Sequence, residues 1–295
     1  MMLRGMKARF LPLLIAIALL PALPACGRGP NPTAASGFAF AVVSDTHIGR
    51  NAGAGNNMEE AVAEINDSAA EFTLFLGDLV EDGNQETDCV QWRRTADGLR
   101  APRHAVPGNH DALRGYTKHV RPETDFAFDH KGVRFICFNN SGPSRSRFEV
   151  TAAQVAWIRG QLEEAGQKGL RVALAAHFPW PMRDAKDPAT AELQKVIEAH
   201  RENIALFLAG HLHVGLRGVE ETPGIQVVVA PSTSYNRDPS PRNAPGWGVA
   251  EYRPAWLLVE FRDDKIILTC RPIGAAASGT HELSVQADRN APVVR

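Results

Sequence analysis

Five short clusters of aspartate, histidine and asparagine residues could carry out chemistry in this sequence. In chain order they are Asp45-x-His47, Gly77-Asp78, Gly108-Asn109-His110-Asp111, His177 and Gly210-His211-x-His213. Imidazole nitrogen and carboxylate oxygen together suit zinc, manganese or iron, whereas calcium and magnesium sites seldom contain histidine. None of the clusters contains cysteine, which argues against a structural zinc site. The clusters therefore indicate a catalytic transition-metal centre.

The spacing within the clusters also fits metal binding. Residues two apart in an extended segment point to the same side, so Asp45 and His47 can bind one metal. His211 and His213 have the same spacing. Two metals about 3.5–4 Å apart need a shared ligand, and a carboxylate with two oxygens can bridge them. Asp78 is the candidate for this bridge, and the expected cofactors are two divalent or mixed-valence transition-metal ions, Fe, Mn or Zn.

Each cluster directly follows a short apolar run that predicts a β-strand buried on both faces. The five predicted strands are residues 38–43, 72–76, 104–106, 170–176 and 204–209. In α/β sheets, ligands gather in the crevice beyond the carboxyl ends of the strands. All five clusters can therefore converge on one site.

The segments between these strands carry helix and hairpin signals. Asn56-Asn57 is the predicted N-cap of a helix with apolar residues at helical spacing, and Thr151 with Gln154 forms a capping-box pattern. Further helices are predicted over residues 89–99 and around 193–197, a hairpin over 125–138, and later strands over 225–229, 256–261 and 265–270. This order predicts an α/β fold, a four-layer α-β-β-α sandwich of two packed mixed sheets, with the metal site at the carboxyl ends of the strands.

The composition is that of an ordinary globular protein. The chain has 295 residues, of which 44% are hydrophobic and 22% are charged, which excludes a fibrous or disordered chain. The 32 basic residues against 33 acidic residues leave a net charge of −1, so no basic excess favours binding to nucleic acid. Four cysteines do not make a disulfide scaffold in a chain of this length.

The N-terminal residues have the pattern of an export signal. Three basic residues precede the apolar run 10–20, which is shorter than the about 20 residues that span a bilayer, so residues 1–26 are expected to be a signal peptide. The string Leu-Pro-Ala-Cys that ends at Cys26 resembles the lipobox of bacterial lipoproteins. Two alternatives stay open, cleavage near Ala25 or lipidation of Cys26. The expected location is exported, periplasmic or cell-envelope, with membrane contact only through such a lipid anchor.

One domain is expected after the signal. Residues 27–37 are rich in Gly, Pro, Ser, Thr and Ala, which is typical of a flexible linker. Residues 38–272 show no internal repeat and no second linker of this composition, and are expected to form a single catalytic domain. Residues 273–295 are expected to be a C-terminal tail.

The ordered set of five clusters resembles the signature of the calcineurin-like metallophosphoesterases, over nearly the whole of residues 38–272. The resemblance implies an enzyme that hydrolyses phosphate mono- or diesters by in-line attack of a metal-bound hydroxide. It also implies that His110, which is not a ligand, helps the leaving oxygen to depart. The ligand sets that it implies are Asp45, His47 and His213 for one metal, Asn109, His177 and His211 for the other, and Asp78 as the bridge.

Three further carboxylates are expected to support this site without binding metal. The family carries a carboxylate shortly after the Gly-Asp pair that orients its non-ligand histidine, and Glu81 and Asp82 stand there in this chain. Asp111 is expected to hold neighbouring ligands in place. In a long loop rich in Pro, Ser, Asn and Arg, Arg237 and Arg242 are candidates for binding a phosphate or carboxylate of the substrate.

Residues 77–83 read Gly-Asp-Leu-Val-Glu-Asp-Gly, which is close to the Gly-Asp-Leu-Thr-Asp-Asp-Gly typical of class III cyclic-nucleotide phosphodiesterases. We therefore expect a member of that branch that acts on a small phosphate-ester substrate. A cyclic-nucleotide or glycerophosphodiester phosphodiesterase is the more specific alternative. A nuclease of the same fold is disfavoured by the lack of a basic stripe, and a non-catalytic metal-binding or scaffolding module by the retention of all seven ligands.

Overall fold

The computed structural model describes residues 37–142, 148–180, 187–222, 225–237, 246–249 and 251–284. The predicted signal peptide with Cys26, most of the predicted linker, and Arg242 lie outside the described residues. Within those ranges, none of the helices combines the length and the apolar character needed to cross a membrane.

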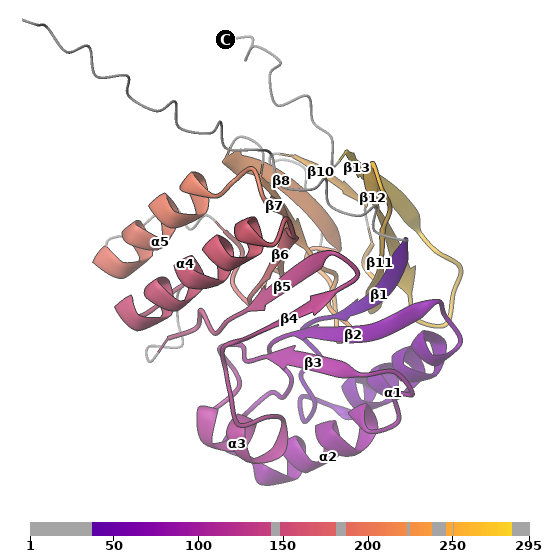
Figure 1. Ribbon diagram of the computed structural model, residues 1–295. Helices are drawn as coiled ribbons and strands as arrows, with labels where there is room; N and C mark the ends of the chain where they lie inside the picture. The colour runs from indigo at the N-terminus through magenta and orange to yellow at the C-terminus, as the bar shows by residue number, and fades with distance from the viewer. Residues whose placement is uncertain are drawn as a thin grey trace, which may run out of the picture. The chain divides into compact units, whose positions relative to one another are not determined.

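Six strands form a first, mixed sheet (Figure 1). β1, β2 and β3 are parallel neighbours, so their carboxyl ends lie at one edge of the sheet. β11, β12 and β13 extend the sheet on the other side of β1 by antiparallel pairing. In order across the sheet the strands are β13 (Gly279–Ser284), β12 (Lys265–Pro272), β11 (Ala255–Phe261), β1 (Phe38–Val43), β2 (Ala70–Leu76) and β3 (Arg103–Val106).

Seven strands form a second mixed sheet. Its centre is parallel, with β9, β7, β6 and β5 running in the same direction, and β4, β8 and β10 pair antiparallel toward its two edges. In order across the sheet the strands are β10 (Trp247–Val249), β8 (Leu216–Thr222), β9 (Ile225–Val229), β7 (Ile204–Ala209), β6 (Arg171–Ala175), β5 (Val133–Cys137) and β4 (Phe126–His130).

Helices cover the outer face of each sheet (Figure 1). The helices over the first sheet are α1 (Ala52–Asn66), α2 (Glu86–Ala96) and α3 (Leu113–His119), and those over the second are α4 (Ala152–Gln167) and α5 (Pro188–Ala199). Together with the two sheets they make four layers, in the order helix, sheet, sheet, helix. The predicted α-β-β-α sandwich is therefore confirmed.

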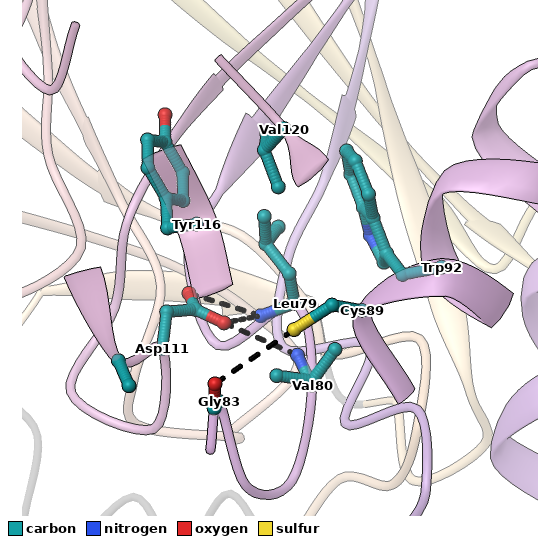
Figure 2. Close-up of a pocket in the computed structure, with 9 residues that line it drawn as sticks. Leu79, Val80, Gly83, Cys89, Trp92, Asp111, Tyr116 and Val120 are labelled. Atoms are coloured by element: carbon teal, nitrogen blue, oxygen red, sulfur yellow. Dashed lines mark hydrogen bonds between the residues drawn. The ribbon is translucent and has the colours of Figure 1, made fainter. Parts of the chain in front are cut away.

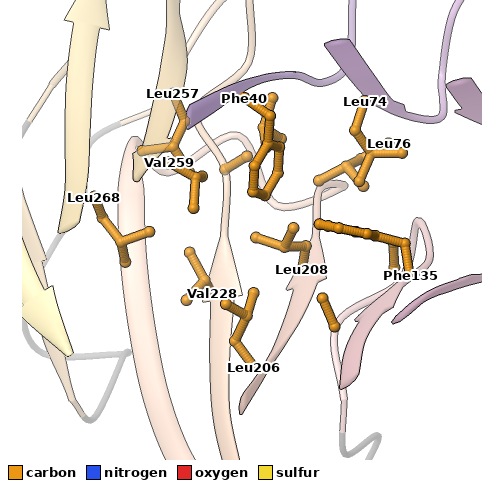
Figure 3. Packing of buried hydrophobic residues seen from close by; sticks show 14 of the residues in the cluster. Phe40, Leu74, Leu76, Phe135, Leu206, Leu208, Val228, Leu257, Val259 and Leu268 are labelled. Atoms are coloured by element: carbon orange, nitrogen blue, oxygen red, sulfur yellow. The ribbon is translucent and has the colours of Figure 1, made fainter. Parts of the chain in front are cut away.

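The largest apolar core lies between the two sheets. Along β1, Phe40 enters this core while its neighbour Ala41 faces the helices, because successive side chains of a strand point to opposite faces. Along β7, Leu208 likewise enters this core, while Phe207 faces the helices over the second sheet. Both faces of these strands are buried, which is why their sequences are unbroken apolar runs. Figure 3 shows Phe40 and Leu208 on opposite sides of this core.

Most of the predicted elements are present, with shifts of a few residues at their ends. The predicted hairpin is formed by β4 and β5, which pair antiparallel from Phe126 to Cys137. The capping box is confirmed at the start of α4: the Gln154 amide donates to Thr151 Oγ1 at 3.2 Å, and the Thr151 amide donates to Gln154 Oε1 at 2.8 Å.

The predicted start of α1 is wrong. The helix begins at Ala52, and its N-cap is Asn51, whose side chain accepts a hydrogen bond from the Ala54 amide at 3.0 Å. Asn56 and Asn57 lie inside the helix. The first turn reads Ala-Gly-Ala-Gly, and these small residues give no hydrophobic periodicity from which the earlier start could be recognised.

The sequence analysis missed α3 and three strands. β10 has only three residues, β8 reads Leu-Arg-Gly-Val-Glu-Glu-Thr, and β13 reads Gly-Thr-His-Glu-Leu-Ser, so none of them shows the apolar run of a buried strand. β13 pairs with β12 from Cys270↔Gly279 to Lys265↔Ser284. The folded domain therefore extends beyond residue 272, into the segment that was expected to be a tail.

We expect Leu208→Ala to lower the free energy of unfolding by about 2–5 kcal/mol, because the two packed sheets cannot close the cavity that it leaves. Val90→Ala, at an exposed position of α2, is the matched control and should change stability by about 0.5 kcal/mol or less. Urea unfolding of the metal-free protein, followed by circular dichroism, measures both. Equally small effects would contradict the placement of Leu208 in the inter-sheet core.

Candidate metal centre

The loops that follow β1 and β2 run side by side beyond the ends of their strands. The Asp45 amide donates a hydrogen bond to the Gly77 carbonyl at 3.0 Å, and the His47 amide donates to the Asp78 carbonyl at 3.0 Å. A parallel bridge continues this pairing a few residues further along both loops. The parallel ladder of β1 and β2 therefore extends into the loops and places two of the predicted clusters against each other.

Five of the predicted ligands have a left-handed backbone conformation. They are Asp45, His47, Asp78, His211 and His213, with φ between 45° and 71°. The one other described non-glycine residue with positive φ is Lys131, in the turn between β4 and β5. Such conformations cost of order 1–3 kcal/mol each and persist only where the surroundings impose them. Their concentration in these loops marks the functional site independently of the residue types.

Close approach of the loops requires two of the motif glycines. A Cβ atom on Gly108 would lie 2.2 Å from the Asp78 amide nitrogen, and one on Gly210 would lie 2.0 Å from Ser44 Oγ. Real Cβ atoms essentially never come so close to another heavy atom. Any larger residue at these positions would therefore force the ligand-bearing loops apart.

The first group of candidate ligands consists of Asp45, His47 and His213. His213 Nε2 lies 3.1 Å from Asp45 Oδ1 and 3.2 Å from His47 Nε2. All three side chains are buried, and one ligand atom of each lies within 4.8 Å of the others. The structure thus brings together the residues that the sequence analysis assigned to one metal.

The second group consists of Asp78, His177 and His211, again with ligand atoms within 4.8 Å of one another. His177 Nε2 lies 3.2 Å from Asp78 Oδ2 and 3.1 Å from Asn109 Oδ1, so Asn109 also contacts this group. Asp78 Oδ2 is in addition 3.7 Å from His47 Nε2 of the first group. Asp78 therefore lies between the two groups, which is the position that a bridging carboxylate needs.

Backbone carbonyls orient two of the histidine rings. His177 Nδ1 donates to the Leu76 carbonyl at 2.7 Å, and His213 Nδ1 donates to the Tyr235 carbonyl at 3.0 Å. Because a carbonyl oxygen can only accept, the Nδ1 atoms carry the protons and the Nε2 atoms are left with a lone pair in the neutral rings. These Nε2 atoms face the aspartates, so both rings have the orientation that metal binding requires.

Asp45 is held by donors from three segments. Ser44 Oγ donates to Asp45 Oδ2 at 2.5 Å, and the His211 amide donates to the same oxygen at 3.0 Å. Ser232, in the loop after β9, donates through Oγ to the Asp45 carbonyl at 3.0 Å. The His211 amide also donates to Oδ1 at 3.1 Å, the oxygen that faces His213 Nε2. The bonds to His211 and Ser232 connect the first sheet with the second.

Electrostatic interactions favour the ionised form of Asp78, the candidate bridging ligand, and the neutral form of His211. Burial alone raises the pKa of Asp78, but the charge of His177 and its hydrogen bond outweigh burial and hold this pKa well below its usual range. Burial, and then the charge of His177, lower the pKa of His211 to about 4. Burial also lowers the pKa of His177, but the charge of Asp78 outweighs it and raises the pKa to about 9.

The donor set fits the metals expected from the sequence. It combines imidazole nitrogens with carboxylate and amide oxygens, which zinc, manganese and iron all accept. His47 Nε2 and His213 Nε2 face each other at 3.2 Å. In neutral rings protonated at Nδ1, these two atoms are both acceptors and repel each other, and a cation between the rings would satisfy both.

Asp111 connects two of the motif loops, and Figure 2 shows its carboxylate facing Leu79 and Val80. Its carboxylate accepts hydrogen bonds from the amides of Leu79 at 3.0 Å, Val80 at 3.2 Å and Gly108 at 2.7 Å. Burial, and then the charge of Asp78, raise the pKa of Asp111 to about 7. The cavity drawn in Figure 2 has a volume of only 10 Å³, room for about one water molecule, so it is not a substrate site.

Glu81 lies at the site, but its carboxylate does not orient His110 as the sequence analysis expected. Glu81 Oε2 is 2.8 Å from His47 Nδ1, whereas the backbone carbonyl of Glu81 accepts the hydrogen bond from His110 Nδ1 at 2.7 Å. The longer glutamate side chain reaches the neighbouring histidine instead. Asp82 Oδ1 accepts hydrogen bonds from the backbone and side-chain nitrogens of Asn84.

Sequence reasoning missed Arg50 and Tyr235. The Arg50 guanidinium lies over the Tyr235 ring at 4.3 Å, and the same ring lies 4.3 Å from the ring of His213. The available signal was the position of Arg50 three residues after His47 in a loop that carries ligands. Arg237, a candidate for holding an anion, has an exposed side chain and contributes its backbone amide, which donates to the His213 carbonyl.

The model of the calcineurin-like phosphoesterase family matches residues 38–215 of the chain. Glycerophosphodiester phosphodiesterase GpdQ of Enterobacter lignolyticus is 27% identical over 200 residues, which cover 59% of this chain and 70% of that protein. A probable cyclic nucleotide phosphodiesterase of Rhodococcus erythropolis is 26% identical over 258 residues, which cover 79% of this chain and 83% of the relative. The crystal structure of a dimetal phosphatase from Danio rerio shares the fold, with a TM-score of 0.65 at 13% identity over 86% of this chain and 99% of that chain.

We expect Asp111→Asn to lower the free energy of unfolding by about 1–3 kcal/mol, because the new amide group turns one acceptor into a donor that faces backbone amides. Asp67→Asn, an equivalent change at an exposed residue, should cost about 0.5 kcal/mol or less. Urea unfolding of both metal-free variants provides the comparison. If the two variants match, Asp111 does not hold the loops together.

Proposed function

Since the chain belongs to the calcineurin-like phosphoesterase family and is a metal-dependent hydrolase of phosphoester bonds, we propose that it is a dinuclear-metal phosphodiesterase of small phosphodiesters. The observation that carries the proposal is the position of Asp78, whose Oδ2 lies 3.2 Å from His177 Nε2 and 3.7 Å from His47 Nε2. A carboxylate between two groups of histidines can bridge two adjacent metal ions.

In this proposal each group of ligands holds one metal ion. The residues are Asp45, His47 and His213 for the first ion, Asn109, His177 and His211 for the second, and Asp78 for both. When bound, the two ions supply Lewis-acid activation of a water nucleophile and neutralise charge on the phosphate. Asn109 contributes a neutral oxygen, which adds no negative charge where an anionic substrate must approach.

His110 is placed to assist the leaving group. Its ring lies 4.7 Å from the ring of His47, beside the first group of ligands. The hydrogen bond from His110 Nδ1 to the Glu81 carbonyl fixes the ring and occupies the Nδ1 proton, so Nε2 can donate to the leaving oxygen only from the doubly protonated imidazolium ring. The phosphodiester oxygen that departs from glycerol or ribose is a strongly basic alkoxide, so this donation matters most for such substrates.

Support for a diester comes from the relatives, which are named for glycerophosphodiesters and for cyclic nucleotides. Both are small molecules with one anionic phosphodiester, whose charge two metal ions can neutralise. The net charge of −1 and the absence of a basic excess fit such a substrate better than a nucleic acid.

Export is part of the proposal and rests on the signal pattern in residues 1–26. Expression of the full chain in a bacterial host, followed by mass spectrometry of the mature N-terminus, tests it. Cleavage near Ala25 and a lipidated Cys26 both support export, and the mass distinguishes them. An intact N-terminus in the cytoplasmic fraction contradicts it.

The direct test of the substrate class uses protein freed of metal and then reconstituted with Mn²⁺, Fe²⁺ or Zn²⁺. We expect hydrolysis of bis-p-nitrophenyl phosphate, cyclic AMP or glycerophosphoethanolamine to exceed that of the monoester p-nitrophenyl phosphate in kcat/KM. Chelation should abolish the activity, and added metal should restore it. A preference for monoesters would replace the diesterase assignment with a phosphatase.

We expect Asp78→Asn to reduce kcat by about 100-fold or more, since even residues that only support metal ligands are worth about 10–100-fold. The fold should survive, because the change is isosteric. Asp67→Asn removes a charge at an exposed site and should keep full activity. Near-normal turnover of Asp78→Asn at saturating metal would contradict the two-metal mechanism.

We expect the effect of His110→Asn to depend on the basicity of the leaving group. Loss of a proton donor should lower kcat/KM for glycerophosphoethanolamine or cyclic AMP by about 10²–10⁴-fold. The effect on bis-p-nitrophenyl phosphate should be much smaller, because p-nitrophenolate departs without a proton. An equal loss on both kinds of ester would show that His110 does not protonate the leaving group.

A further inference from the structure

Glu81 and His47 face each other on the side of the imidazole ring that points away from the candidate metal ligands. Glu81 Oε2 and His47 Nδ1 are 2.8 Å apart, while His47 Nε2 faces the Nε2 atom of His213. Both facing atoms are buried, and neither has a hydrogen-bond partner of suitable geometry within the described part of the chain. Leaving such atoms unpaired is costly, so each is the natural partner of the other.

We propose that Glu81 is a positioning residue for metal binding, which fixes the orientation of His47 and raises its strength as a ligand in the group with Asp45 and His213. The inference rests on the proposed two-metal function and goes beyond it, because it assigns to one side chain the control of one of the two metal sites.

The group that faces the Nδ1 atom distinguishes His47 from His177 and His213. The Nδ1 atoms of His177 and His213 donate to the backbone carbonyls of Leu76 and Tyr235. A carboxylate is a stronger acceptor than a carbonyl and makes the opposite ring nitrogen more basic. His47 is therefore the ligand whose strength depends on a side chain rather than on the backbone.

Neighbouring contacts hold Glu81 in place. Its amide donates to the Ile48 carbonyl at 2.8 Å, which ties the position of Glu81 to the loop that carries His47. Arg50 Nη1 lies 3.8 Å from Glu81 Oε2, and the same guanidinium packs on the ring of Tyr235. Glu81 is thus restrained both at its backbone amide, by Ile48, and at its carboxylate, by Arg50.

The length of the side chain is part of the inference. The Glu81 backbone carbonyl already accepts the hydrogen bond from His110, and the carboxylate extends beyond it to His47. An aspartate at this position would keep the charge but retract the carboxylate by one methylene. Glu81→Asp therefore separates positioning from charge, and Glu81→Gln keeps the length while removing the charge.

The experiment titrates metal-free protein with Mn²⁺, and separately with Zn²⁺, by isothermal titration calorimetry. The wild type should bind two ions. In Glu81→Gln and in Glu81→Asp one of the two affinities should fall by about 10–100-fold while the other stays unchanged. Glu86→Gln, an equivalent substitution at an exposed residue of α2, should leave both affinities unchanged.

Two further readouts separate positioning from a general structural role. Urea unfolding of the metal-free variants should match the wild type, and the visible spectrum of the Co²⁺-loaded Glu81 variants should show altered coordination at one ion. Unchanged affinities in both Glu81 variants, wild-type affinity in Glu81→Asp, or equal weakening of both sites would each overturn the inference. A wild type that binds no metal would overturn the proposed function itself, and the inference with it.

Discussion

The candidate site depends on the pairing of the β1 loop with the β2 loop. Backbone hydrogen bonds from Asp45 to Gly77 and from His47 to Asp78 continue the parallel ladder past the ends of the strands. They hold Asp45, His47 and Asp78 in left-handed conformations that these residues rarely adopt. The cost of this strain, of order 1–3 kcal/mol per residue, is met by the folded scaffold. The backbone pairing of the two loops therefore positions these three candidate ligands.

The two sheets contribute different parts of the site. β1, β2 and β3 of the first sheet lead to Asp45, Asp78 and Asn109, and β6 and β7 of the second lead to His177 and His211. The inter-sheet core sets the distance between these strand ends, and the bridge between the segments after β1 and β9 joins them at the site. Packing of apolar side chains in the core thus helps to set the geometry of the candidate ligands.

Much of the fold and the ligand set could be predicted from the sequence, and the reason is physical. Strands buried on both faces are unbroken apolar runs, and the polar residues that end them must meet at one edge of a parallel sheet. Elements that are not buried on both faces were missed or misplaced, because their sequences carry no such apolar run. β10 and β13 are short edge strands with mixed composition, and the first turn of α1 consists of alanine and glycine.

The direction of a side chain could not be predicted in the same way. Glu81 was expected to reach His110, because its position after the Gly-Asp pair suggested that partner. Its carboxylate meets His47 instead, since the backbone carbonyl of Glu81 already occupies His110 Nδ1. Such choices depend on one methylene and on loop register, which residue types and spacing do not encode. Asp111 was expected to hold neighbouring ligands in place. Its hydrogen bonds to three backbone amides could not be predicted, because they depend on how the two loops fold against each other.

Two metal ions should bind on either side of Asp78. Anomalous diffraction from crystals of the Mn²⁺-loaded protein tests it most directly. We predict two peaks about 3.5–4 Å apart, one beside His47 and His213 and the other beside His177 and His211, with Asp78 in contact with both. A single peak, or two peaks that do not share Asp78, would contradict it.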